Sequence, residues 1–159
     1  MRQLSEQTGA NDGRFFQILY TPIVEGTPPS GGLSPKVFEV ADAAYGTMFT
    51  FYIVKIPEMR QVVLYYNADQ ANGADAYVKI HVGSLSKESD VITTAVPLQL
   101  AIYLDISSLA NWAIHTVYVE AKIAGGAETL DIQGIAVIAR DEITAASGET
   151  TYAITDPVE

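Results

Sequence analysis

The amino-acid sequence predicts an all-β protein, an antiparallel β-sandwich of the jelly-roll kind with an extended N-terminal arm. Three observations lead to this prediction. Apolar and polar residues alternate along successive short segments, which is the period of a strand with one buried face. Turn-forming residues separate these segments, and no segment keeps the apolar spacing of an amphipathic helix. About eight such segments fit between residues 37 and 142, as expected for a jelly roll.

Five segments in the first part of this region each place apolar side chains on one face. In chain order, the residues predicted to face inward are Phe49, Phe51 and Ile53; Val62, Leu64 and Tyr66; Val78, Ile80 and Val82; Leu98, Leu100, Ile102 and Leu104; and His115, Val117, Val119, Ala121 and Ile123. The stretches 67–75, 83–90 and 106–112 are rich in residues that favour turns. We therefore expect strands at the five segments and loops at these stretches.

The last clear strand, Thr129–Arg140, changes phase part of the way along. Leu130 and Ile132 point to one face and Val137 to the other, with Gly134 at the changeover. A glycine at such a position predicts a β-bulge, because an extra residue shifts the alternation by one. The alternative is a central strand that is buried on both faces.

The first 36 residues differ from the rest and predict an arm that leaves the sandwich. The segment Gly26–Gly32 is rich in Gly, Pro, Ser and Thr, so it is neither a helix nor a central strand. The apolar run 15–20 precedes it and is expected to pack on a neighbouring molecule. The residues predicted to bind that partner are Phe15, Phe16, Ile18, Leu19 and Tyr20. The alternative is that this run forms the first strand of the same domain.

Three parts of the chain are thus predicted. Residues 1–36 are the N-terminal arm and linker, residues 37–142 the sandwich, and residues 143–159 a C-terminal extension. The extension contains Thr150–Thr155, a segment suited either to an added edge strand or to a contact with a neighbouring subunit. A length of 159 residues fits one domain of this kind.

Composition indicates a protein that buries apolar surface against partners. Hydrophobic residues make up 48% of the chain and charged residues 18%, which excludes disorder and is unusually apolar for a lone monomer. We therefore expect a homo-oligomer. The net charge of −10 and the scattered basic residues argue against binding to nucleic acid or to an anionic membrane. The absence of a secretory signal and of an apolar membrane span favours synthesis in a cytoplasm.

Residues able to do chemistry are few, and we expect neither an enzyme nor a cofactor or metal site. The chain has no cysteine, which excludes disulfides and thiolate metal sites, and no Gly-x-Ser-x-Gly motif. His81 and His115 are far apart in the sequence, and each is expected to be an ordinary surface or rim residue. The loop 67–75 is the best candidate for calcium, but Ala71 falls where EF-hand spacing requires a ligand.

Aromatic residues suggest one alternative function. The chain has one tryptophan and nine tyrosines, and aromatic rings of this kind can stack on sugars. The candidates for a glycan-binding platform are Trp112, Tyr103 and Tyr118. Trp112 lies between two predicted strands, so the other interpretation is that its ring closes the end of the core.

Two passages resemble known jelly-roll families. The segment Leu104–Leu109 followed by Ile114–Glu120 is similar to the strand, loop and strand passage of jelly-roll carbohydrate-binding modules. The same region extended to Leu130–Val137 resembles small structural proteins of tailed bacteriophage virions. In those proteins a segment like Phe38–Ala44 leads into one like Met48–Phe51, and a closing strand ends the sandwich.

The phage resemblance implies an accessory virion protein without enzymatic activity, such as a capsid decoration or head-fibre protein. Such proteins are often trimers that bind the major capsid protein or other virion proteins, and they are made in the cytoplasm of the bacterial host. We prefer this resemblance because the sequence shows no secretion signal and no disulfide, whereas carbohydrate-binding modules commonly belong to secreted enzymes. The alternative function is glycan binding, either for receptor recognition or as a module associated with an enzyme.

Overall fold

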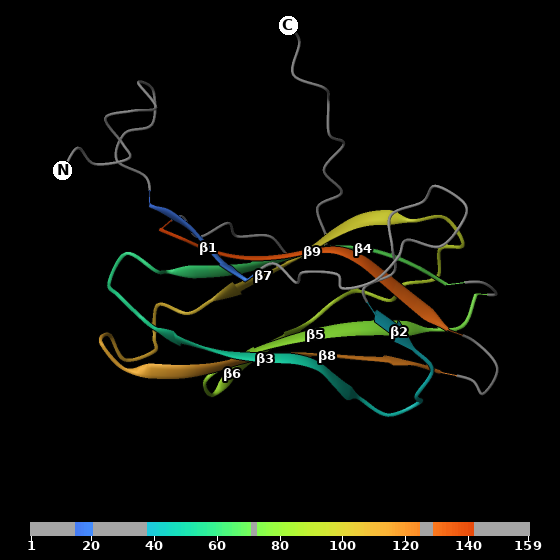
Figure 1. The fold of residues 1–159 in the computed structure, drawn as a ribbon, viewed down its shortest axis with the longest axis horizontal. Coiled ribbons are helices and arrows are strands. Elements are labelled where there is room, and N and C mark those ends of the chain that lie inside the picture. Colours follow the sequence, from blue (N-terminus) through green and yellow to red (C-terminus); the bar gives the residue numbers. More distant parts are fainter. Residues whose placement is uncertain (1–14, 21–37, 71–72, 125–128, 142–159) are drawn as a thin grey trace, which may run out of the picture.

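The computed structural model describes residues 15–20, 38–70, 73–124 and 129–141, and these residues form strands and no helix. Two antiparallel sheets pack face to face, and Figure 1 shows them as two layers. The predicted antiparallel β-sandwich is confirmed. In the described ranges the strands are β1 (Phe16–Tyr20), β2 (Phe38–Val40), β3 (Gly46–Val54), β4 (Gln61–Gln70), β5 (Ala76–Val82), β6 (Leu85–Glu88), β7 (Leu98–Asp105), β8 (Ile114–Ile123) and β9 (Leu130–Arg140).

Strands that are far apart in the chain lie side by side. Sheet A has the order β1-β9-β4-β7, with β2 also paired to β9, and sheet B has the order β3-β8-β5-β6. From the middle of the chain outwards, the pairs are β5 with β6, β4 with β7, β3 with β8, and β2 with β9. Successive pairs alternate between the two sheets, so the chain follows the path of one long hairpin wrapped around a core.

The observed strands match the predicted ones, with three differences. The short strand β2 was not predicted. β4 continues to Gln70, into the predicted loop 67–75, because β7 and β9 both continue to pair with it beyond Tyr66. β6 lies inside the predicted loop 83–90 and pairs with β5 at the edge of sheet B. Its side chains are exposed apart from the half-buried Leu85, so no alternating pattern marks it in the sequence.

The hydrophobic core lies between the sheets and contains most of the residues predicted to face inward. Val62 and Leu64 of sheet A and Val78 and Ile80 of sheet B are at most 1% exposed. Burial of each such side chain contributes about 1.5–3 kcal/mol to stability, so the four central strands β4, β9, β5 and β8 dominate the energetics. Leu98 is an exception, since it begins β7 and is exposed to solvent.

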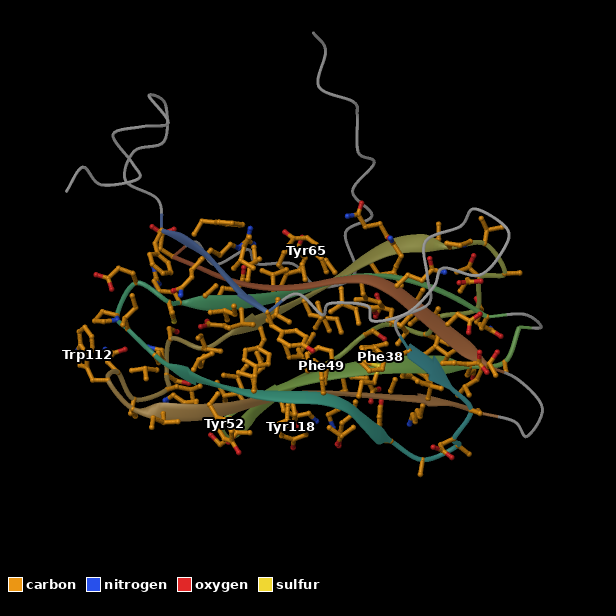
Figure 2. The ribbon with its side chains drawn as sticks, viewed as in Figure 1. Phe38, Phe49, Tyr52, Tyr65, Trp112 and Tyr118 are labelled. Atoms are coloured by element: carbon orange, nitrogen blue, oxygen red, sulfur yellow. The ribbon has the colours of Figure 1, made fainter. Side chains whose placement is uncertain are left out.

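Aromatic rings close the core on the side where β1, β2 and β3 approach one another. The ring of Tyr20 stacks on those of Phe49 and Phe51, with centroids 4.6 and 5.1 Å apart. Phe38 lies 5.8 Å from Phe49, and Figure 2 shows both of these rings between the sheets. The cluster therefore joins strands of sheet A to the edge of sheet B, at about 0.5–1.5 kcal/mol for each ring pair beyond its burial.

β9 contains a bulge and is also buried on both faces. The predicted opposite orientation of Val137 is wrong, because Leu130, Ile132 and Val137 all pack in the core between the sheets. Gly134 has a φ of 55°, and the pairing of β9 with β4 shifts register there, as expected of a bulge. Beyond the bulge, Ile138 points away from the core, yet it is only 5% exposed. It belongs to a second apolar cluster on the outer side of sheet A with Val63, Ala101 and Tyr103.

Replacing Gly134 by alanine should cost more stability than replacing Gly73. Both have a positive φ, at which an L side chain costs about 1–2 kcal/mol. A Cβ at Gly73 would meet nothing within 4 Å, whereas one at Gly134 would lie 2.9 Å from Nδ2 of Asn67. The Asn67 amide is the mobile end of a half-buried side chain and must move aside, so we expect Gly73→Ala to lower the free energy of unfolding by about 1 kcal/mol and Gly134→Ala by about 1–2 kcal/mol. Urea unfolding measures both, and equal losses would contradict the steric argument.

Candidate functional site

The apolar run 15–20 forms β1 at the edge of sheet A, paired with the end of β9 in the same chain. The residues of the predicted partner-binding set that pack against the core of their own sandwich are Phe15, Leu19 and Tyr20. Their burial needs no second molecule, which corrects the expectation for these three and agrees with the alternative of a first strand. Phe16 and Ile18 point outward and are 59% and 60% exposed, so they remain candidates for contact with a partner. The rest of 1–36, and 143–159, lie outside the described residues.

A second group of exposed apolar side chains lies at one end of the sandwich. This end patch consists of Tyr52, Val54, Trp112 and Ile114, which are 52–73% exposed. Val54 of β3 and Ile114 of β8 are direct cross-strand partners, and Tyr52 is two residues before Val54 on the same outer face. Figure 2 places Trp112 at the tip of the molecule and Tyr52 on the outside of sheet B. Clustered apolar exposure of this kind is typical of a contact surface rather than of free solvent-facing sheet.

The backbone around Trp112 is fixed by contacts to the end of β3. Trp112 is the one non-glycine residue with a positive φ in the described ranges, at 59°. Its N–H donates to the C=O of Lys55 at 2.6 Å, and the N–H of Lys55 donates to the C=O of Ala113 at 3.1 Å. The Lys55 side chain is buried, and its Nζ donates to Oδ1 of Asn111. Strained backbone held in this way is a recurrent property of functional sites.

The three aromatic residues predicted to form a glycan platform do not come together. Tyr118 lies on the outer face of sheet B, where its ring stacks on that of His81 with centroids 4.1 Å apart. Tyr103 lies on the outer face of sheet A, almost buried, beneath the guanidinium of Arg140 at 5.2 Å. Trp112 is at the tip and exposed, so it does not close the core. The expected platform of three rings is therefore absent from the described part of the chain.

The outer face of sheet B away from the end patch is polar. Nε2 of His81 lies 2.8 Å from Oε2 of Glu120, its neighbour on β8. The hydroxyl of Tyr45 donates to Glu88, and burial together with this carboxylate raises the pKa of Tyr45. The ammonium of Lys122 lies 4.4 Å from the Tyr45 ring centroid. These side chains contact one another across the outer face of sheet B, a network that no spacing in the sequence reveals.

The histidines have separate, structural surroundings. His81 lies on β5 beside Glu120 and Tyr118, as described above. His115 begins β8, and its Nε2 lies 2.9 Å from the C=O of Ala110 in the preceding turn. In neither case does a described serine or threonine hydroxyl hydrogen-bond to the ring in the manner of an activated nucleophile.

The calcium candidate at 67–75 is largely organised by Gln70. Its Oε1 accepts hydrogen bonds from the N–H groups of Gly73 and Ala74, both at 3.1 Å, and its Nε2 donates to the C=O of Ala74. Asp69 belongs to β4 and pairs with Asp131 on β9. Within the described ranges, no three or more His, Asp or Glu side chains are arranged to hold a metal ion.

Removing the acceptor of the buried Lys55 ammonium should destabilise the fold more than removing the ammonium itself. Asn111→Ala takes an acceptor from Nζ at a residue 2% exposed, which costs about 1–3 kcal/mol. Lys55→Met leaves the exposed Asn111 to bind water, so we expect a loss below about 1 kcal/mol. Urea unfolding of the two variants tests this order, and the reverse order would refute the role given to the hydrogen bond.

Comparison with known proteins does not identify a relative. No protein-family model matches the chain, and no curated protein matches it significantly. None of the described residues forms a helix long and apolar enough to cross a membrane. The function is therefore inferred from the fold, the surfaces and the resemblance of the strand segments.

Proposed function

We propose that the protein is a non-enzymatic structural protein of a virion, a capsid decoration or head-fibre protein that binds other virion proteins. The observation that carries the proposal is the exposure of large apolar side chains in two groups: Phe16 and Ile18 on β1, and the end patch. Two such groups on a chain of this size favour a protein that works in an assembly, because partners remove them from water.

The place of that assembly in a virion rests on the resemblance of the strand segments to phage proteins. The strand order supports the jelly-roll part of this resemblance. The nested pairs alternate between two four-strand layers once β1 is set aside, and a double-sheet jelly roll has this arrangement of eight strands.

The polar side chains of sheet B support a structural role. A general base must lie within hydrogen-bond reach of the proton that it removes. Glu120 occupies Nε2 of His81, and Tyr118 covers a face of its ring. Tyr45 and Glu88 bind each other in the same way. These contacts hold the polar side chains of sheet B to one another.

The proposed partners are the major capsid protein or another virion protein, and further copies of this chain. The phage resemblance implies a trimer, whereas the open edge of β3 in sheet B favours a twofold dimer. Burial of Phe16 and Ile18 contributes about 1.5–3 kcal/mol each, whereas association of two proteins costs about 4–15 kcal/mol. Attachment through several subunits at once offsets this cost by raising the effective concentration. The acidic surface argues against nucleic acid and anionic membranes as partners.

The proposal predicts that virions made from the genome that encodes this chain contain it at a fixed stoichiometry. Replacing Phe16 and Ile18 together by serine should reduce its incorporation about a hundredfold, the equivalent of roughly 3 kcal/mol of lost apolar burial. Val96→Ser is the control, because Val96 is 66% exposed and belongs to neither apolar group. Quantitative mass spectrometry of purified virions measures incorporation, and absence of the wild-type protein from virions would refute the proposal.

Glycan binding is the second candidate, favoured by the exposed ring of Trp112 on a backbone held by Lys55. Sugar sites combine a stacking ring with several polar groups, but the other members of the end patch include the aliphatic Val54 and Ile114. We therefore expect no saturable signal from the wild-type protein on a glycan array. A signal that disappears in Trp112→Ala would favour the glycan function instead.

A further inference from the structure

Strand β3 presents an open backbone edge. It pairs with β8 on one side, and no other described strand pairs with its second side. The N–H and C=O of Lys55 form hydrogen bonds on the β8 side. Along an antiparallel strand these groups point alternately to the two sides, so the residue before Lys55, and every second residue before that one, directs its N–H and C=O to the open edge. The residues concerned are Thr50, Tyr52 and Val54. Each offers a donor and an acceptor at the edge.

This edge lacks the features that protect the other edge strands. β3 is nine residues long, Gly-Thr-Met-Phe-Thr-Phe-Tyr-Ile-Val, with no charge and no proline. Proteins usually shorten exposed edges or place charges on them to prevent pairing with another chain. Among the other edge strands, β1 is uncharged but has five residues, β2 has three residues, β6 has four and carries Lys87 and Glu88, and β7 ends in Asp105. A long, uncharged edge strand is therefore a pairing surface.

A second copy of this chain fits the surface best. The chain carries a net charge of −10, so two copies repel each other across most approaches. At β3 no like charges meet, since both strands are uncharged. Two identical strands that pair antiparallel are related by a twofold axis, and this makes a closed, self-complementary contact. The outward Thr50, Tyr52 and Val54 of each copy would lie side by side across it, residue types that favour such pairs.

We propose that two copies of the protein pair edge to edge through β3, so that sheet B continues across the dimer as one eight-strand sheet. This inference rests on the proposed assembly role and names the strand and the partner that serve it. The end patch extends the contact between the two β3 strands on the outer face of sheet B, because Tyr52 and Val54 belong both to β3 and to the end patch. The exposed Phe16 and Ile18 are on sheet A and stay available to a different virion protein.

The test is the mass of the full chain in solution, by sedimentation equilibrium over a range of concentrations. We expect the wild-type protein to be a dimer. Thr50→Lys places a charge at each side of the joint, and Tyr52→Pro removes an N–H that points to the open edge and binds nothing on β8. Both variants should be monomers with the wild-type circular dichroism spectrum. Ser86→Lys is the matched control, exposed on the same face at the opposite edge strand, and should remain a dimer.

Each outcome separates the two proposals. A wild-type monomer, a trimer, or dimers that persist in both β3 variants would overturn the pairing, and the virion proposal would still stand if the protein is present in purified virions. A β3-dependent dimer that is absent from virions would support the pairing and refute the virion role. If a strand of another protein, and not a second copy, occupies the edge, the wild-type protein alone is a monomer, which also overturns the proposal.

Discussion

Burial of alternate side chains between sheets A and B positions every other feature of the molecule. The central strands β4 and β9 face β5 and β8, with core residues such as Val62 and Val78 wholly excluded from solvent. Nested pairing then brings β1 against the end of β9, and the turn at Trp112 against the end of β3. The surfaces proposed for assembly are therefore carried by the ends and edges of a rigid slab, where a fixed backbone lowers the entropy lost on binding.

The alternation of residue types predicted most of the side chains that enter the core. Phe49, Val62, Ile80 and Val119 are all buried as expected, because a strand with one wet face must separate its side chains by period two. Gly134 in β9 also predicted the bulge, because a shift of one residue in the apolar alternation requires one extra residue in the strand. Both patterns involve residues that are close together in the chain, so they can be recognised in a single sequence.

The sheet to which a strand belongs depends on pairing with strands that are distant in the sequence. This explains why the predicted glycan platform was wrong. The alternation of apolar and polar residues predicted that Tyr103 and Tyr118 face outward, but it carried no information that they belong to opposite sheets. The register that puts Glu120 beside His81 has the same origin, because it is set by pairing between β5 and β8. The signal that could have found the end patch was present: Tyr52 and Val54 occupy outward positions of their strand and are not polar.

The single tryptophan of the chain stands on the end patch, on a backbone held by Lys55. Its indole is largely surrounded by water in the isolated chain. The tryptophan emission of the protein thus originates from one known place on its surface and reports the polarity there. Any molecule that covers this tip would shift that emission to shorter wavelength, so the protein carries its own label for events at one end of the sandwich.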